Sequence, residues 1–291
     1  MDFKQVKYFL TIVDKGGFSG AAQDLFISQS SLSKSIISLE KELGVLLFDR
    51  SKRKVALTPA GSAYLSYAKN LQQIYQDLIF DLGDFKSVST LKIATIPVIA
   101  QYGISNYISS FKAAHPEIPL SLDEHEASTI LPRLDSHEHD LAFVRDNYLD
   151  KKQYDFLEID QDKLLVVVSA KHQFAERTSI TLSELKAENF IMFEKGTIHH
   201  EIVVDSCRNA GFEPSITYSS LRVESIVGLV ASNSGISLMM EKVFNYSKHS
   251  DVVAIPLTEN IESNIVLVWL KDKKTSKAAG AFIDFMKLNI L

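Results

Sequence analysis

Apolar residues recur with helical spacing through residues 28–43. They follow the three- and four-residue steps of a single buried stripe, made by Leu32, Ile36, Leu39 and Leu43. The opposite face carries small polar and basic side chains, namely Gln29, Ser30, Ser33, Lys34 and Lys41. Ser28 can cap the first free backbone N–H groups, where the helix dipole also favours an anion. The pattern predicts a helix that packs through one face and is free to bind through the other.

Two further helices are predicted before this one. Residues 18–25 form a short helix with small apolar residues on its inner face, and residues 1–15 form a longer helix that ends at a pair of glycines. The dipeptide Phe26-Ile27 makes a tight connection from the short helix to Ser28. Helix, short turn and second helix make a helix-turn-helix, and the first helix supplies the third wall of its core.

A hairpin with a basic tip is predicted after these helices. Gly44 permits a reversal of the chain, and residues 46–50 and 55–57 resemble two short strands. The basic side chains at the tip are Arg50, Lys52, Arg53 and Lys54. Beside the helix of residues 28–43 they would form a wing able to contact phosphates or the minor groove. A solvated run of charge is the alternative, and it would be favoured if the hairpin stood alone.

A long helix is predicted to begin at Thr58-Pro59, a cap followed by proline at the first helical position. Apolar residues recur along it at near-heptad steps: Tyr64, Tyr67, Leu71, Ile74, Leu78 and Phe85. This spacing predicts pairing with a second copy of the same helix. We therefore expect a first domain over residues 1–58, a dimerising linker helix over 59–86 and a hinge over 87–90.

From Leu91 onward, strand-like runs alternate with helical stretches, which predicts an α/β architecture. The predicted strands cover residues 91–95, 120–124, 140–144, 164–169, 190–193, 215–219, 236–239 and 265–270. Helices are predicted between them, and a last helix over residues 277–288. We expect two parallel-rich sheets in two lobes with a cleft between them. Lobe I is assigned to residues 91–162 and 266–291, and lobe II to residues 163–265.

Composition and charge indicate the number of domains, the position of the basic region and the cellular compartment. The 291 residues suffice for about two domains, and 46% hydrophobic residues is ordinary for a globular protein. The net charge is −5, but residues 1–58 hold nine Lys and Arg against six Asp and Glu, so they carry +3 and the rest carries −8. No apolar run suits a membrane span, no signal peptide is evident, and Cys207 is the single cysteine. We expect a cytoplasmic protein with no membrane partner.

The local positive charge favours double-stranded DNA as the partner of the first domain. We predict that Gln29, Ser33 and Lys34 reach the major groove, with Ser28 and Ser30 beside them at the helix N-terminus. The cations of the wing are predicted to contact the backbone or the minor groove. A helical hairpin of an ordinary soluble domain has the same spacing, but the basic wing and the long helix that follow weigh against it.

Several motifs occur in the order in which one protein family carries them. In the first domain they span residues 18–25, 28–29, 32–34, 39–44, 47–50 and 57–61. Downstream they span residues 140–144, 210–214, 230–231 and 235–236. Through these motifs the chain resembles a LysR-type transcriptional regulator over nearly its whole length.

The resemblance implies a winged helix-turn-helix, a linker helix and a two-lobed effector domain like that of periplasmic binding proteins. It also implies an operator with an inverted repeat, a dimer of dimers, RNA polymerase as a partner, and a small-molecule effector, with no cofactor. Two positions depart from the family. Ser30 stands where proline is frequent, which a first turn tolerates, and Ile37 stands where a basic residue is common. Ile37 removes a phosphate contact and offers an apolar surface to a thymine methyl group, so the operator cannot be inferred from relatives.

The effector cleft is expected beyond the carboxyl ends of the strands, where open α/β folds bind ligands. From this rule and the resemblance, the candidate residues are Thr95, Pro97, Val98, Ser128, Thr129, Arg145, Gly196, Thr197 and His199. Arg145 beside a helix N-terminus suits an anion such as a carboxylate. The alternative for Arg145 is an ion pair with Asp146 or Glu124. Val98 stands where the family often has serine or threonine, so that side of the pocket is expected to be drier.

Other chemistry has little support in the sequence. The histidine clusters, His137 with His139 and His199 with His200, lack the spacing of a closed zinc site, and no metal is predicted. Cys207 lies in a helical stretch and is expected to be a buried structural thiol. The main alternative function is a DNA-binding domain fused to a catalytic α/β domain.

Against that alternative, the sequence has no phosphate-binding glycine loop, nucleophile elbow or matched carboxylate pair. An architectural DNA-binding protein would leave the two-lobed domain without a role. We therefore predict a ligand-responsive transcriptional regulator without catalytic activity.

Overall fold

The computed structural model describes residues 1–49, 55–83, 90–125, 127–247 and 249–290. The chain divides into two compact units, Met1–Leu82 and Gly83–Leu291. The finer domain and lobe boundaries predicted from the sequence stay predictions. Within the described residues, no helix is both long enough and apolar enough to cross a membrane.

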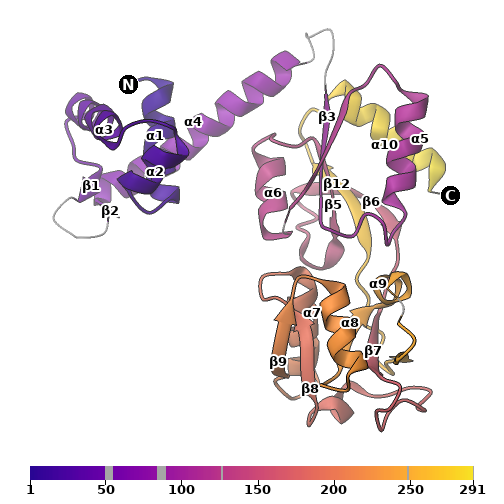
Figure 1. The fold of residues 1–291 in the computed structure, drawn as a ribbon. Helices are drawn as coiled ribbons and strands as arrows, with labels where there is room; N and C mark the ends of the chain where they lie inside the picture. Colours follow the sequence, from indigo (N-terminus) through magenta and orange to yellow (C-terminus); the bar gives the residue numbers. More distant parts are fainter. Residues whose placement is uncertain (50–54, 84–89, 126, 248, 291) are drawn as a thin grey trace. The chain divides into compact units, whose positions relative to one another are not determined.

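The first unit packs helices and a short hairpin around one core (Figure 1). Its elements are α1 (Phe3–Asp14), α2 (Phe18–Asp24), α3 (Gln29–Leu43), β1 (Phe48–Asp49), β2 (Ala56–Leu57) and α4 (Pro59–Gly83). The predicted stripe of α3 is buried except for Leu43, which is 38% exposed at the helix end. The stripe joins the same core as Phe9, whose ring centroid lies 5.1 Å from that of Phe48 and 4.8 Å from that of Tyr64.

Residues at both ends of α3 determine its length. The hydroxyl oxygen of Ser28 accepts a hydrogen bond from the backbone N–H of Ser31 at 3.1 Å, which satisfies one free donor of the first turn. At the other end Gly44 has φ 71°, a left-handed conformation that ends the helix and that glycine adopts without steric cost. The predicted helix is therefore present with its predicted cap.

Lobe I of the second unit is built on a five-stranded sheet in the order β4-β3-β5-β12-β6. The strands are β3 (Leu91–Thr95), β4 (Leu120–Glu124), β5 (Leu141–Arg145), β6 (Tyr154–Asp160) and β12 (Ile265–Leu270). β3 runs parallel to β4 and β5, whereas β12 runs antiparallel to β5 and β6. β6, which the sequence reading missed, forms one edge of this sheet.

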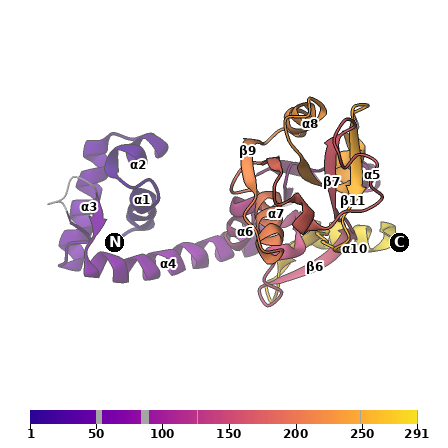
Figure 2. The ribbon, with the colours of Figure 1, turned by 90° about the horizontal axis from the view of Figure 1, so that it is seen from below.

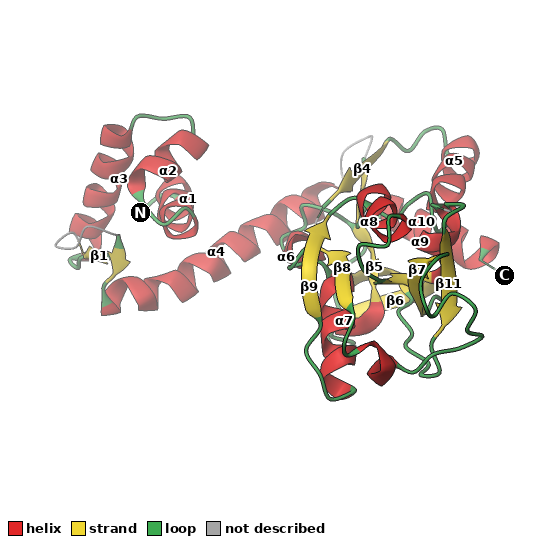
Figure 3. Ribbon diagram, turned by 60° about the horizontal axis from the view of Figure 1, so that its bottom comes forward, coloured by secondary structure: helices red, strands yellow, loops and turns green. Residues whose placement is uncertain are grey.

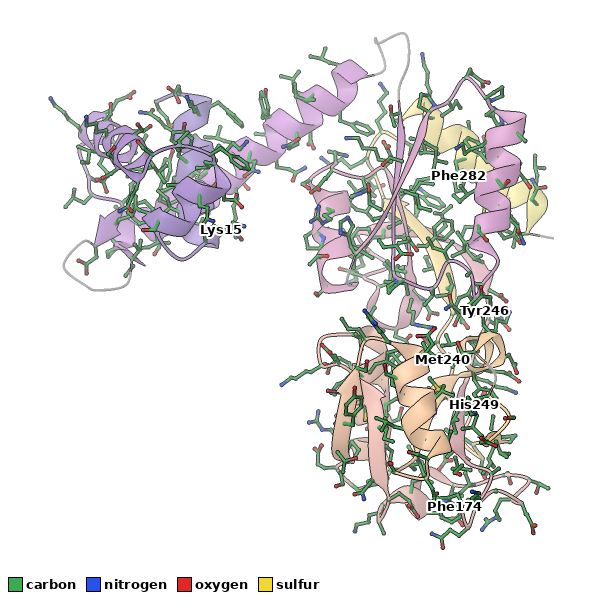
Figure 4. All side chains as sticks on the ribbon, viewed as in Figure 1. Lys15, Phe174, Met240, Tyr246, His249 and Phe282 are labelled. Atoms are coloured by element: carbon green, nitrogen blue, oxygen red, sulfur yellow. The ribbon has the colours of Figure 1, made fainter. Side chains whose placement is uncertain are left out.

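Helices cover both faces of this sheet (Figure 1). α5 (Ile104–Ala114) and α10 (Lys277–Asn289) pack side by side on one face, and α6 (Ala127–Asp135) covers the other. Phe282 of α10, labelled in Figure 4, is fully buried. Its ring centroid lies 4.9 Å from that of Phe111 on α5 and 6.3 Å from that of Phe143 on β5. A short 3-10 turn, η1 (Asp146–Tyr148), follows β5.

Lobe II differs from the expected parallel-rich sheet. Its strands are β7 (Leu164–Ser169), β8 (Asn189–Phe193), β9 (Ser215–Ser220), β10 (Ser237–Met240) and β11 (Val252–Pro256). β10 and β11 both pair antiparallel with β7, whereas β8 and β9 pair in parallel. Figure 2 shows β7 and β11 side by side. The expectation of two parallel-rich sheets is therefore wrong for lobe II, because a strand buried on both faces is a continuous apolar run in either direction.

The helices of lobe II pack against these strands (Figure 3). They are α7 (Ile198–Asn209), α8 (Val223–Ala231), α9 (Glu241–Tyr246) and the 3-10 turn η2 (Leu182–Leu185). A parallel bridge between Phe190 and Ile236 links the two groups of strands. In it, the N–H of Ile236 donates to the carbonyl of Asn189 at 2.8 Å. This close approach requires Gly235, since a Cβ there would lie 2.6 Å from the Asn189 oxygen.

The chain crosses between the lobes twice, once between β6 and β7 and once between β11 and β12 (Figure 1). Asp162 lies in the first crossover and Ser263 in the second, and both are buried. The carboxylate of Asp162 accepts backbone hydrogen bonds from Lys163 at 2.8 Å and Lys242 at 3.3 Å. These contacts fix the first crossover against the start of α9.

Gly235→Ala should destabilise the second unit, because the added Cβ would meet a backbone oxygen that the sheet holds in place. We expect a loss of ~1–3 kcal/mol in the free energy of unfolding. Urea unfolding of the full-length protein measures it. Gly228→Ala is the control within the same lobe: Gly228 is exposed on α8 with no atom within 4 Å of an added Cβ. That variant should be stabilised by ~0.5–1 kcal/mol, and equal stabilities would contradict the packing described.

Candidate functional site

The N-terminal turn of α3 presents polar side chains to solvent. Ser28, Gln29, Ser30 and Lys34 are exposed, and Ser33 is half-buried. The side-chain oxygen of Gln29 accepts a hydrogen bond from the hydroxyl of Ser19 on α2 at 2.8 Å. This bond ties the exposed end of α3 to the preceding helix and orients the Gln29 amide. The predicted packing face is thus buried and the opposite face is polar and largely exposed; DNA contact through that face stays a prediction.

The predicted wing cations, Arg50, Lys52, Arg53 and Lys54, lie outside the described residues. The base of the hairpin is described, with Phe48 paired to Leu57 and Asp49 to Ala56. Glu40 of α3 accepts backbone hydrogen bonds from Leu47 at 2.8 Å and Phe48 at 3.1 Å. Glu40 is 4% exposed, so its carboxylate attaches the hairpin to the helix from within the core. Glu40 lies in the motif of residues 39–44, but no local pattern indicates its role, because its partners belong to the hairpin.

The second unit contains a cavity of about 130 Å³ between its lobes. Lobe I contributes Ile96, Pro97, Val98, Gln101 and Arg145, and lobe II contributes Phe193, Thr197, Ile198, His199, Leu221, Val223 and Val243. Five of the predicted effector residues therefore come together here: Pro97, Val98, Arg145, Thr197 and His199. The other lining residues, mostly apolar, were missed because their periodicity equally suits the core.

The remaining candidates lie elsewhere than in this lining. Thr95 is fully buried at the end of β3, and its hydroxyl donates to the backbone oxygen of Ile96 at 2.8 Å. Ser128 and Thr129 are exposed on the first turn of α6. Gly196 is exposed with φ 96° in the turn before α7. The structure thus brings together in the cavity lining the candidates that lie at or after the ends of β3 and β5 and at the start of α7. Thr95, Ser128, Thr129 and Gly196 do not line the cavity.

Arg145 lines the cavity and is 4% exposed. Its Nη1 donates to the backbone oxygen of Ser263 at 3.0 Å and to its hydroxyl at 3.2 Å, and Nη2 donates to the Tyr102 hydroxyl at 2.8 Å. The Tyr102 hydroxyl in turn donates a hydrogen bond to the carboxylate of Asp162. Burial raises the pKa of Tyr102 well above its ordinary value, so the phenol stays protonated.

The alternative prediction, an ion pair of Arg145 with Asp146 or Glu124, is wrong, because the hydrogen bonds of Arg145 go to Ser263 and Tyr102. Asp146 accepts from the backbone N–H of Asn264 at 3.0 Å and from its side-chain amide at 3.2 Å. The groups that receive the hydrogen bonds of Arg145 come from Tyr102 and from the second crossover.

His199 lines the cavity from α7 and is 9% exposed. Both ring nitrogens are buried, and neither has a hydrogen-bond partner among the described residues. Its ring centroid lies 4.5 Å from that of Phe193. Burial, with smaller contributions from Arg145 and His200, lowers the pKa of His199 to about 3, so its ring is neutral near pH 7. A buried imidazole without a partner is costly and therefore suits a ligand that supplies one.

Neighbouring polar groups at the start of α7 are already paired. The hydroxyl of Thr197 donates to the Glu194 carbonyl at 2.9 Å and accepts from the His200 N–H at 3.2 Å. The Nδ1 of His200 lies 2.9 Å from the Phe193 carbonyl oxygen. In the described ranges, no group of three His, Cys, Asp or Glu residues is arranged to hold a metal ion. Cys207 is buried as expected, and burial raises its thiol pKa to about 12.

Family models match both units of the chain. Residues 3–62 match the bacterial regulatory helix-turn-helix protein of the lysR family, and residues 86–289 match the LysR substrate binding domain. The chain belongs to the LysR family. It is a LysR-type transcriptional regulator, which binds DNA through its helix-turn-helix and carries an effector-binding domain.

Individual relatives agree with this assignment over the whole chain. The LysR-family chain is 30% identical to the uncharacterised regulator YwbI of Bacillus subtilis, covering 99% of this chain and 96% of YwbI. It is 25% identical to the transcriptional dual regulator GltC of Bacillus subtilis, covering 98% and 96%. Among solved structures it is similar to HinK, a LysR family regulator from Pseudomonas aeruginosa, with 25% identity, 99% and 98% coverage and a TM-score of 0.59.

His199 should make the stability of this LysR-family protein depend on pH. Its pKa is lowered from 6.5 to about 3 on folding, so the folded state favours the neutral ring. The resulting stability is fully present above pH 6.5 and is lost as the pH falls toward 3, with a slope of up to ~1.4 kcal/mol per pH unit. Urea unfolding at several pH values should show a shallower loss in His199→Phe than in the wild type.

The control for this measurement is His249→Phe. His249 is exposed (labelled in Figure 4), so this variant removes a surface histidine and leaves the buried ring of His199 in place. Parallel profiles for His199→Phe and the wild type would contradict the buried neutral histidine.

Proposed function

We propose that this regulator binds an inverted-repeat operator through the N-terminal turn of α3 and is controlled by a small molecule in the interlobe cavity. One observation carries the proposal: the cavity is lined by both lobes, at strand ends in lobe I and at the start of α7 in lobe II. A ligand held by both walls has different contacts when the lobes move apart. Such a difference in affinity is what couples binding to a change of state.

For the DNA contact we propose Gln29, Ser33 and Lys34 as base-reading residues, with Ser28 and Ser30 at the phosphates beside the helix N-terminus. The exposure of four of these five side chains and the cap at Ser28 support this assignment. Ser33 is half-buried, so its hydroxyl would reach the groove only at the edge of the contact. The wing residues Arg50, Lys52, Arg53 and Lys54 are proposed to contact the backbone or the minor groove.

We propose further that the cavity binds its ligand without changing it. A pKa of about 3 makes His199 a poor general base near neutral pH. The hydroxyl of Thr197 is committed to Glu194 and to the N–H of His200, which does not suit a nucleophile. The rival function, a catalytic domain fused to a DNA-binding domain, therefore has weaker support.

The linker helix α4 supports a dimer. Apolar side chains on it are exposed: Tyr67 by 69%, Leu71 by 37%, Ile74 by 64%, Leu78 by 51% and Leu82 by 49%. They follow one stripe, which a second copy of α4 would cover. Tyr64, from the predicted stripe, instead packs on the core of the first unit, and Phe85 lies outside the described residues. We propose further that two such dimers associate into a dimer of dimers. This assembly acts in the cytoplasm, with RNA polymerase as a partner.

Gln29→Ala should weaken operator binding by ~1–3 kcal/mol and relax the preference at one base pair. The loss arises because the amide that Ser19 orients is removed. Titrations of operator and scrambled DNA in gel shifts measure it. Lys112→Ala, an exposed lysine on α5, is the control and should leave binding unchanged. Equal losses on both DNA sequences would refute the base-reading role.

Ile74→Glu should weaken or abolish self-association through α4, because it places a charge in the apolar stripe. Sedimentation of the full-length protein over a range of concentrations should show smaller species than the wild type. Gln76→Glu adds the same charge on the opposite side of the helix and should associate normally. A mass distribution of Ile74→Glu equal to that of the wild type would count against pairing through α4.

A further inference from the structure

The walls of the interlobe cavity are mainly hydrocarbon. Eight of its lining residues are apolar: Ile96, Pro97, Val98, Phe193, Ile198, Leu221, Val223 and Val243. They come from both lobes, so a ligand there is enclosed by apolar side chains from two sides. Transfer of apolar surface from water into such an environment is favourable, whereas an ion loses hydration that these side chains cannot replace.

Two uncharged polar groups in the lining have no hydrogen-bond partner in the described part of the chain. Both ring nitrogens of His199 are buried without a hydrogen bond to any residue of the described ranges. The side-chain amide of Gln101, half-buried on the lobe I wall, likewise makes no hydrogen bond within the part of the chain that is described. A neutral imidazole offers one donor and one acceptor, and an amide offers both kinds. These groups therefore match a ligand that can donate and accept without carrying a charge.

The one ionised group in the lining is already compensated. Arg145 donates to Ser263 and to the Tyr102 hydroxyl. Asp162 accepts a hydrogen bond from the same hydroxyl, so a carboxylate stands behind the guanidinium. His199 adds no second positive charge, because its lowered pKa keeps the ring neutral near pH 7. The negative charge of Asp162 offsets part of the attraction of Arg145 for an anionic ligand. Such a ligand would also lose its hydration in an apolar cavity.

The size of the cavity sets the scale of the ligand. Its volume is about 130 Å³, and a lined cavity of about 150 Å³ is known to hold benzene. A molecule of roughly one ring therefore fills it.

We propose that the effector is an uncharged, mostly apolar molecule of about one ring that exchanges hydrogen bonds with His199 and Gln101. The proposal rests on the proposed function of the cavity as the effector site. It departs from the anion expected from Arg145 in the sequence, because the structure gives that arginine other partners.

Three probes of similar shape test the class of ligand on the full-length protein. Benzamide is uncharged and both donates and accepts, benzoate differs from it chiefly by its charge, and toluene has no polar group. Titration calorimetry should rank benzamide first, with benzoate weaker by about tenfold or more. In His199→Phe, which keeps an aromatic ring but no nitrogen, benzamide should lose most of its advantage over toluene. Thermal unfolding of each variant without probe checks that it folds.

Leu221→Trp separates the site from the ligand class. Leu221 is 51% exposed and lines the cavity, so a larger side chain there fills the space without a buried clash. Benzamide binding should be lost in this variant. Binding that survives Leu221→Trp would lie outside the cavity, which would overturn the proposed effector site.

Two results would overturn the uncharged class and leave the effector site in place. The first is benzoate binding more tightly than benzamide and being lost in Leu221→Trp. The second is no binding of benzamide at millimolar concentration while benzoate binds. Failure of all three probes would also refute the proposed class.

Discussion

A buried positive charge needs the protein itself to replace the water it loses, and Arg145 is 4% exposed at the end of β5. Its hydrogen bonds reach Tyr102 before α5 and Ser263 in the second crossover, and through Tyr102 they reach Asp162 in the first. The requirement to pair one guanidinium therefore fixes both chain crossings to the end of β5, the central strand of the lobe I sheet. The interlobe cavity lies where this network meets the start of α7.

Two roles fall on different side chains around the cavity: some hold the crossovers together, and another is left to bind a ligand. Arg145, Tyr102 and Asp162 satisfy one another, so they hold the crossovers whether or not a ligand is present. His199 has buried ring nitrogens with no hydrogen-bond partner among the residues that the structure describes, a cost that ligand binding can remove. In the proposed function, a ligand that supplies this partner gains most where both lobes line the cavity. A difference of this kind is the physical requirement for an effector to shift a population of states.

In the first unit a buried negative charge is likewise compensated by hydrogen bonds from the protein. Glu40 is buried on α3 and accepts the backbone N–H groups of Leu47 and Phe48. The helix that presents polar side chains to solvent thereby also anchors the base of the hairpin. Local patterning identified α3, its cap at Ser28 and its packing stripe, because a helix is made of contacts within four residues. The bounds of β3, β4, β7 and β12 were likewise predicted as they are found.

The sequence by itself thus determined most of the elements, the order of the two units and the family resemblance, since each depends on short-range spacing. It missed β6 and β11, and it could not specify that β10 and β11 run antiparallel to β7, because an apolar run suits either direction. Only the tertiary structure decided the partners of Arg145, which stand 43 and 118 residues away in the chain. It also decided which candidates share the cavity: Val98 and His199 meet there, while Thr95 turns inward. Contacts between distant residues leave no local pattern, and these are the contacts that shape the interlobe cavity.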